Sequence, residues 1–457
     1  MNNPRSGRMH LLLEAPIFQM LWKLGAPNVI AVVILTSVTV ADAWFVGQIG
    51  TVPLASLAIV FPFQTLMQMM AGGAIGGGVT SALARALGSG QSEHADAVAW
   101  HAVVIGVVMS IVFIAWLAFM PEPIFALLGG KGEVLDGAIR YAQIAFGGAT
   151  ATWLLYIFAA ILRGTGDTAT PATAIICTSI LQIFVSGVLT LGLGPIPSFG
   201  IVGPAIAIVI CQGLAALYML VHLISSRSGI QLRVRALRWH PLADILKVGA
   251  VGLINSLTIP ATVLTVTGIV GQYGTAALAG YGLGSRLELM LVPIVFGIGG
   301  VLTAAVGANI GAGQHARARR IAWTGAACAA LVTGAIGATV AVAPQFWLGW
   351  FTTDPEAYTF GAIYLAIAAP FYGFFGGGQT LYFASQGTGR MILPVFVGVV
   401  RFAIVAAVGS LAVAMSWGIT VVFAAVSAGL ITIGVGLALC LFTSAWRPSP
   451  SPVATSP

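Results

Sequence analysis

The sequence has very few charged residues for its length. Only 7% of its 457 residues are Asp, Glu, Lys or Arg, whereas 58% are apolar and the mean hydropathy is +1.00. A water-soluble protein of this size needs a charged surface, so the composition predicts a surface that faces lipid. The net charge of +7 is not gathered in one basic cluster, so nucleic acid is not an expected partner.

The residues of familiar enzyme and metal sites are also scarce. The four cysteines lie in apolar stretches without metal-ligand spacing, and we expect packed side chains and no metal site. The sequence contains no phosphate-binding loop of the GxxxxGK[ST] type, which argues against direct use of ATP. None of the six histidines pairs with a carboxylate at ligand spacing, so we expect solvated or interfacial imidazoles. We therefore predict neither an enzyme nor an organic cofactor, and the N-terminus lacks the pattern of a cleaved signal peptide.

What the sequence does contain is long apolar stretches. A helix needs roughly 20 apolar residues to cross a bilayer, and twelve stretches suffice. They lie at about 18–46, 54–86, 97–120, 135–162, 171–193, 201–224, 244–272, 277–308, 319–342, 357–384, 392–414 and 418–444. The predicted fold is an all-α membrane protein with twelve transmembrane helices.

The two halves of the chain repeat each other in the same direction. The segment 86–100, ALGSGQSEHADAVAW, and the segment 309–323, NIGAGQHARARRIAW, are identical at six of fifteen positions. Two further pairs keep nearly the same offset: VGQIGT at 46–51 with VGQYGT at 270–275, and the Gly-Thr-Gly sequences that begin at 164 and 387. Parallel repeats in a membrane protein predict two matching bundles related by an axis along the membrane normal.

The basic residues predict the orientation and the boundaries. Fourteen of the nineteen Lys and Arg residues fall on the side that holds both termini, and only Lys131 and Arg140 fall on the other. By the positive-inside rule both termini are cytoplasmic. We expect the following segments: a cytoplasmic segment at 1–17, an N-terminal lobe of six helices at 18–225, a cytoplasmic loop at 226–243, a C-terminal lobe of six helices at 244–446 and a disordered tail at 447–457.

Only two of the twelve acidic residues, Asp42 and Glu288, lie deep inside the predicted spans, and the other ten are in loops or at span ends. A charged group there costs roughly 2.5–3.5 kcal/mol on insertion scales, so it usually faces a cavity or a partner. Asp42 lies about five residues from the end of its helix, or roughly 7 Å below that end. Loss of water disfavours the charged form of such a carboxyl, so Asp42 is a candidate proton-binding group. The alternative is an interfacial Asp that hydrogen-bonds a neighbouring helix.

Glu288 has two possible interpretations. Arg286 is two residues away and does not face it on a helix, whereas Arg401 in span 11 is a candidate partner. Glu288 is therefore either part of a structural salt bridge or, with Arg286, part of a substrate cavity. Uncharged polar residues inside the spans are further cavity candidates, or else interhelical hydrogen-bond groups. They are Gln64, Gln68, Tyr156, Gln182, Ser186, Asn255 and Gln379.

Three short motifs in this duplicated chain resemble the multidrug and toxic compound extrusion (MATE) family. They are Asp42–Gly50 (DAWFVGQIG) at the end of the first span, Leu162–Thr168 (LRGTGDT) after the fourth and Gly307–Gly313 (GANIGAG) after the eighth. The Arg286–Glu288 stretch is most similar to the branch named for the DNA-damage-inducible F protein. The resemblance implies two six-helix lobes around a cavity that opens alternately to each side. It also implies that Asp42 is the cation-coupling carboxylate.

One departure from this family concerns the coupling ion. Members of the branch often carry an Asn and, four residues later, an Asp in helix 5, where this sequence has Gln182 and Ser186. A sodium site with two carboxylates is thus disfavoured, and a single protonatable Asp42 suits H⁺ coupling better. The acids expected in helices 7 and 10 of another branch are also missing.

The resulting hypothesis is a monomeric antiporter of the inner (plasma) membrane. It exports small, amphipathic, cationic organic compounds in exchange for protons by alternating access. Two alternatives stay open: a Na⁺-coupled drug antiporter of the same family and a lipid-linked oligosaccharide flippase. A flippase usually has a strongly cationic cavity, for which Arg286 and Arg401 are the candidate residues. The sequence does not identify the substrate.

Overall fold

The computed structural model describes residues 4–225 and 229–447, and in these residues every regular element is a helix. Eleven helices or continuous helical segments are long and apolar enough to cross a membrane, and α7 with α8, bent by 45°, forms the twelfth. The twelve predicted spans are thereby confirmed. Part of the predicted tail, 448–457, and residues 226–228 of the predicted loop lie outside the described residues.

The helices of the first half are α2–α10, which form the N-lobe. Their bounds are α2 Ile17–Gln48, α3 Thr51–Gln68, η1 Met69–Ile75, α4 Gly76–Gly88, α5 Ser92–Phe113, η2 Ile114–Ala118, α6 Pro121–Leu127, α7 Gly132–Gly147, α8 Ala149–Gly164, α9 Ala169–Leu191 and α10 Val202–Ile224. The π-helical segment η1 continues α3 into α4, so the three elements make one span. A further helix, α1 (Pro4–Leu13), precedes the N-lobe.

The helices of the second half are α11–α18, which form the C-lobe. Their bounds are α11 Trp239–Gly271, α12 Thr275–Gly311, α13 His315–Val342, α14 Gln345–Leu348, α15 Pro355–Ala368, η3 Ala369–Phe371, α16 Tyr372–Thr388, α17 Ile392–Ala414, α18 Ile419–Cys440 and η4 Ser444–Trp446. The start of α11 at Trp239 lies five residues before the span expected from hydropathy. A helix of 37 residues such as α12 is roughly 55 Å long, longer than the hydrocarbon core, so it tilts or projects beyond it.

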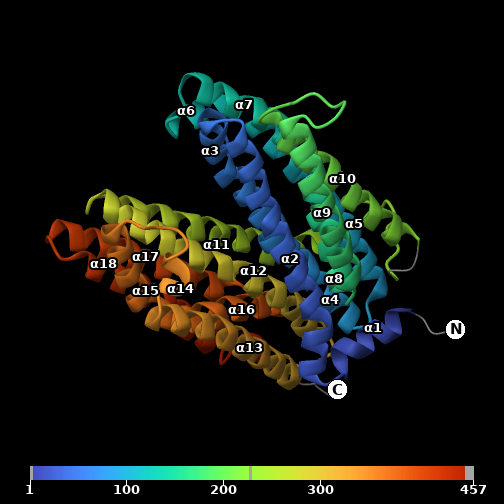
Figure 1. Cartoon of the computed structure of the whole chain (residues 1–457). Helices are drawn as coiled ribbons and strands as arrows, with labels where there is room; N and C mark the ends of the chain where they lie inside the picture. The colour runs from blue at the N-terminus through green and yellow to red at the C-terminus, as the bar shows by residue number, and fades with distance from the viewer. Residues whose placement is uncertain (1–3, 226–228, 448–457) are drawn as a thin grey trace, which may run out of the picture.

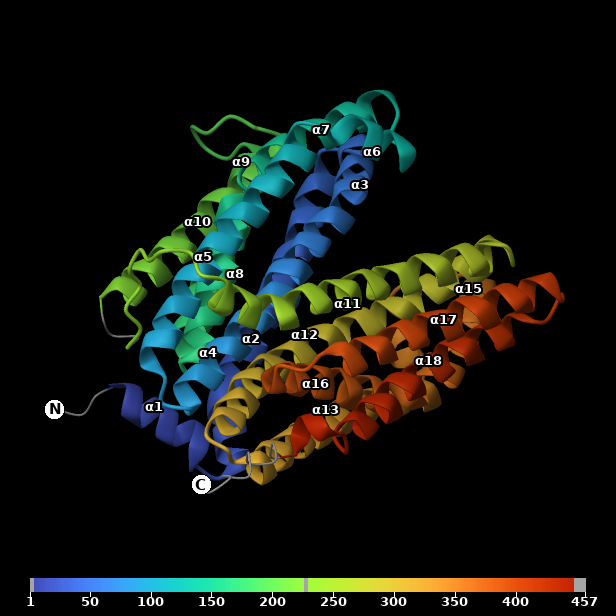
Figure 2. The same ribbon diagram turned by 180° about the vertical axis from the view of Figure 1, so that it is seen from behind.

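The two lobes are arranged as a V (Figure 1). They meet at one end, beside α1, and diverge toward the end that carries α6 in one lobe and the α17–α18 turn in the other, as the reverse view also shows (Figure 2). We call these the closed end and the open end. Each lobe has its own apolar core, and the C-lobe core also takes in Leu12, Met20 and Leu24 from α1 and the start of α2.

Equivalent residues of the two halves have equivalent structures. The turn residues Gly90 and Gly313 have φ angles of +78° and +74°, a left-handed conformation that favours glycine. Thr80 donates a hydrogen bond to the Ala160 carbonyl (3.0 Å), and Thr303 makes the corresponding bond to Phe383 (2.8 Å). The internal repeat seen in the sequence is therefore a repeat of structure.

Glycines of the repeat allow the lobes to touch at the closed end. A Cβ atom on Gly88 would lie 2.1 Å from the Ala308 carbonyl oxygen, and one on Gly311 would lie 2.2 Å from the Arg85 carbonyl oxygen. These two contacts are related by the internal repeat, since Arg85 corresponds to Ala308 and Gly88 to Gly311. Any side chain larger than hydrogen would push α4 and α12 apart.

Hydrogen bonds reinforce the contact between the lobes. The Asn28 amide donates to the Gly297 carbonyl at 2.7 Å. The Gln386 amide donates to the Gly73 carbonyl, within the π-helical segment η1, at 2.8 Å. These bonds are buried or partly buried, and each joins the N-lobe to the C-lobe, so they stabilise the conformation that is closed at this end.

The basic loop between the lobes is docked on α5 of the N-lobe. Trp100 donates to the Arg235 carbonyl (2.9 Å), and the Arg238 amide donates to His101 (2.8 Å). A backbone amide of the same loop, at Gln231, donates to Asp96 at 3.0 Å. The described part of this loop is thereby held against the N-lobe until α11 begins.

Candidate functional site

Asp42 lies in α2 and packs against α9 inside the N-lobe. Its side chain is buried, with the residue 6% exposed, and the Ser186 hydroxyl donates a hydrogen bond to its carboxylate at 2.5 Å. The close approach of α2 and α9 depends on Gly187, where a Cβ would lie 2.8 Å from the Phe45 ring. The neighbouring small residue therefore allows Ser186 to reach Asp42.

A small cavity opens beside the carboxylate. Its volume is about 30 Å³, which is room for one or two water molecules and far below the size of an organic drug site. The polar side chains that line it, including three glutamines expected from the sequence, are Thr39, Asp42, Gln64, Gln68, Tyr141, Gln182 and Gln212. The cavity suits water, a proton or a bare cation.

Three of these polar residues, Thr39, Tyr141 and Gln212, were missed in the sequence. The Tyr141 hydroxyl donates to the Gln64 side chain at 3.3 Å, and Gln212 accepts a hydrogen bond from Thr152 at 2.5 Å. Gln212 was detectable as a polar residue inside the sixth span. Tyr141 was not distinctive, because a tyrosine near the end of an apolar helix is common and only packing places it beside Gln64.

The electrostatics of this site are those of an unpaired acid. Among the described residues, no Lys, Arg or His side chain forms an ion pair with Asp42. The glutamines line the cavity but carry no charge, and Ser186 is the group that hydrogen-bonds the carboxylate. A buried carboxylate without a counter-ion is costly, and taking up a proton or a cation removes that cost.

Glu288 lies in a separate place, inside the C-lobe. Its carboxylate accepts a hydrogen bond from the Tyr364 hydroxyl at 3.0 Å. The Tyr364 ring packs edge-on against Tyr281 and Phe423, with centroid distances of 5.2 and 5.1 Å. Arg401, the candidate partner, is buried and interacts electrostatically with Glu288, but the direct hydrogen bond comes from the tyrosine.

The other candidates are scattered through the two lobes. Tyr156 packs on Gly72 in η1, where a Cβ would lie 2.8 Å from its ring. Asn255 in α11 lies against Gly398 of α17, and Arg286 in α12 is exposed. The structure therefore brings Gln64, Gln68, Gln182 and Ser186 together around Asp42, and it does not bring Tyr156, Asn255, Arg286 or Glu288 to that cavity.

The expectation for the histidines is wrong. His94 lies 2.8 Å from an Asp244 carboxylate oxygen, and His222 lies 3.5 Å from Asp167. The first pair joins α5 to α11 and the second joins α10 to the turn after α8, so sequence spacing does not reveal either pair. Two i,i+4 pairs, His240 with Asp244 and His10 with Glu14, were visible in the sequence and were overlooked.

The sequence of this chain matches a known protein family. Residues 27–188 and 253–412 match the family described as MatE, one segment in each half. A Shewanella oneidensis protein named FAD transporter is 29% identical over 372 residues, which is 80% of this chain and 81% of the relative. The Thermotoga maritima protein named probable multidrug resistance protein NorM is 26% identical over 70% of this chain and 69% of its own.

Solved structures show the same fold. A transporter of the MOP superfamily from Pyrococcus furiosus superimposes with a TM-score of 0.87 at 22% identity, over 94% of this chain and 96% of the other. A structure described as the outward-facing conformation of a multidrug resistance MATE family transporter gives 0.84 at 22% identity, again over 94% and 96%. The two-lobe arrangement of twelve spans is thus shared with these transporters.

Proposed function

The chain belongs to the MatE family of membrane transporters, and from this premise we propose that it exports amphipathic, cationic organic compounds in exchange for protons. The observation that carries the proposal is the environment of Asp42. It is a buried carboxyl with Ser186 as its hydrogen-bond donor, next to a cavity of about 30 Å³. A space of that size admits the coupling ion and excludes the drug, which must then bind elsewhere between the lobes.

The orientation follows from the basic residues. The closed end holds α1, the docked basic loop and most of the arginines of the loops, so we assign this end to the cytoplasm and the open end to the outside. Both termini are then cytoplasmic, and the V of Figure 1 is open to the outside. In this conformation Asp42 takes up a proton from outside.

The proton cycle uses the charge of Asp42. Proton uptake neutralises the carboxyl and removes its attraction for a cationic substrate, which then leaves to the outside. The lobes then rock so that their closed end separates, the Asn28–Gly297 and Gln386–Gly73 hydrogen bonds break, and the space between the lobes opens to the cytoplasm. Release of the proton to the cytoplasm restores the charge. The substrate that binds next is thus exchanged for the proton.

Coupling to sodium would require a set of oxygen ligands around the ion, whereas coupling to protons requires one titratable acid. A Na⁺ ion at this cavity would have one carboxylate, Asp42, and the neutral oxygens of the glutamines, because Ser186 stands where a second acid is common in the branch. The single titratable acid therefore supports protons as the coupling ion. The DNA-damage-inducible F branch stays our expectation on the Arg286–Glu288 stretch alone.

The test is export of a fluorescent cationic dye from vesicles under an imposed pH gradient, and then under a sodium gradient. We expect export with the pH gradient alone, and its loss in the Asp42→Asn variant. Asp136→Asn, which changes an exposed acid of α7, is the matched control and should export normally. Wild-type export by Asp42→Asn, at equal amounts of protein in the membrane, would overturn the assignment.

A second candidate substrate is a flavin dinucleotide. The relative named FAD transporter is aligned over 80% of this chain, and its similarity includes both halves. FAD is an anion, so its export would require cationic groups, of which Arg286 on α12 is exposed. Vesicles loaded with FAD decide between the two: export of FAD with no export of cationic dye would favour the flavin.

A further inference from the structure

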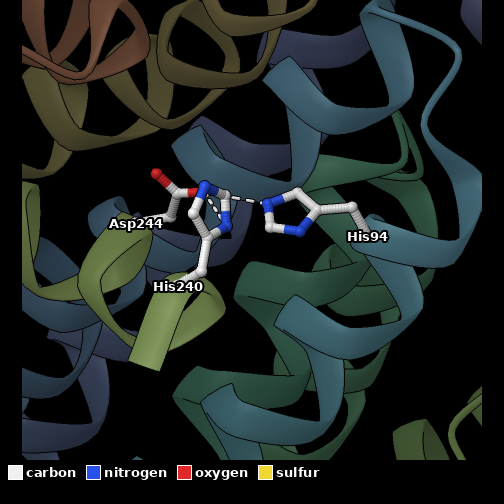
Figure 3. Close-up of side chains that lie close together, drawn as sticks. All are labelled: His94, His240 and Asp244. Carbon is white, nitrogen blue, oxygen red and sulfur yellow. Dashed lines mark hydrogen bonds and ion pairs between the residues drawn. The ribbon is translucent and has the colours of Figure 1, made fainter. Parts of the chain in front are cut away.

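Three possible metal ligands meet where the two lobes touch (Figure 3). His94 comes from α5 of the N-lobe, and His240 and Asp244 come from the first turns of α11 in the C-lobe. Their ligand atoms all lie within 4.8 Å of one another, and this is the one such group of three in the described part of the chain. Two imidazoles and a carboxylate are a donor set that binds Zn²⁺ and similar ions.

The distances are close to those of a metal site. His94 Nε2 lies 2.8 Å and His240 Nδ1 lies 3.8 Å from the same oxygen of Asp244. In a tetrahedral zinc site the ligand atoms are about 3.3 Å apart, because each lies about 2.0–2.1 Å from the metal. The third separation, between the two imidazole nitrogens, is no more than 4.8 Å. Side-chain shifts of about 0.5 to 1.5 Å would therefore fit an ion between the three atoms.

The surroundings leave the binding atoms available. Lys247 donates to the other oxygen of Asp244 at 2.5 Å, which orients the carboxylate and turns its second oxygen toward the histidines. A metal bound there would replace the direct contact of that oxygen with His94, which is 2.8 Å long. The His240 side chain is 81% exposed, whereas those of His94 and Asp244 are about one-fifth exposed. The site is thus partly buried on two sides and open to solvent on the third, where an ion enters and water completes the coordination.

We propose that His94, His240 and Asp244 form a binding site for a divalent transition metal of the zinc type, which clamps α5 to α11. The ligands belong to different lobes, so a bound ion cross-links the lobes near the closed end. Separation of the lobes at this end would pull His94 away from the other two ligands. Metal binding should therefore slow transport by holding this end closed. This consequence rests on the proposed transport function, whereas the binding itself does not.

Binding is tested on the full-length protein in detergent, purified without a polyhistidine tag. Titration calorimetry with Zn²⁺ should show one site, and Co²⁺ should give the visible absorption of a tetrahedral ion. His94→Ala and His240→Ala should each weaken binding more than about tenfold, since even groups that only orient a ligand contribute about 10–100-fold. His10→Ala is the control, because His10 has Glu14 as its single carboxylate partner at 2.9 Å on an exposed surface.

His240 is exposed, so its replacement by alanine should not disturb folding. A loss of Zn²⁺ binding in this variant can therefore be attributed to the missing imidazole. Equal Zn²⁺ affinity in the wild type and His240→Ala would overturn the site.

Micromolar Zn²⁺ on the cytoplasmic face should slow dye export by the wild type and leave His240→Ala unaffected. If binding is found and export is unchanged by Zn²⁺, the clamp is wrong while the site stands. If no substrate is exported without Zn²⁺, the proposed function fails independently of the binding result.

Discussion

Ser186 donates a hydrogen bond to Asp42 at 2.5 Å, and the two residues lie 144 positions apart on different helices of the N-lobe. The resemblance to the DNA-damage-inducible F branch would place a second acid at the serine's position. A hydroxyl cannot add a second negative charge, so the pair holds one exchangeable proton. It also fixes the carboxylate toward the glutamine-lined cavity.

Replacement of Ser186 tests how far transport depends on this hydrogen bond. Hydrogen bonds to charged groups contribute about 1.5–3 kcal/mol, so we expect Ser186→Ala to lower proton-driven export about tenfold or more while the protein still folds. Dye efflux at a fixed pH gradient measures the effect. Ser179→Ala, another buried serine of α9, should export like the wild type. Equal rates for the two variants would contradict a role for Ser186.

The contact between α4 and α12 predicts a difference between two glycines of one helix. Gly311→Ala would place a Cβ 2.2 Å from the Arg85 carbonyl oxygen, whereas Gly282→Ala meets nothing within 4 Å. Overpacking typically costs about 1–3 kcal/mol, so Gly311→Ala should lower the melting temperature. Gly282→Ala should be neutral or slightly stabilising, because alanine is the better helix former. Thermal unfolding in detergent compares them, and equal melting temperatures would refute the close contact.

The aromatic surroundings of Glu288 lead us to expect a structural role for it. Glu288→Gln keeps an acceptor for the Tyr364 hydroxyl, so it should preserve most of the dye export that Asp42→Asn abolishes. Tyr364→Phe leaves the partly buried Glu288 carboxylate without its direct donor and should destabilise the protein by about 1–3 kcal/mol. Loss of export in Glu288→Gln, with normal thermal stability, would instead make Glu288 a coupling residue of the C-lobe.

The assigned orientation predicts which loops react from each side. In a background without the four native cysteines, Lys131→Cys at the open end should be labelled by an impermeant thiol reagent added outside cells. Ser92→Cys at the closed end should be labelled only after the membrane is permeabilised. Both residues are exposed, so burial does not bias the comparison. The reverse pattern would place the termini outside.

The fold was largely predictable because its main signals are local. Twelve apolar stretches follow from composition over about 20 residues, and the repeat follows from direct alignment of the halves. The glycines at 90 and 313 also proved to be equivalent turns. Hydropathy gave the stretch 54–86 as one span, but it did not show the π-helical segment at Met69–Ile75 within that span, since this segment depends on backbone hydrogen bonding.

The site was predictable only in part. Asp42 stood out because a charge inside an apolar helix is rare and costly. Tyr141 and Gln212 did not stand out, because helix packing alone decides which polar side chains share a cavity. The same reason applies to His94, which meets Asp244 from 150 residues away, between two lobes.

The sequence by itself thus determined the number of spans, the two matching halves and the acid deep inside a span of the N-lobe, because each follows from composition or from a repeat along the chain. Only the tertiary structure decided that Ser186 faces Asp42, that Gly88 and Gly311 bring the lobes together, and that two histidines meet Asp244. These relationships require the crossing of helices that are distant in sequence, and side-chain packing sets that crossing.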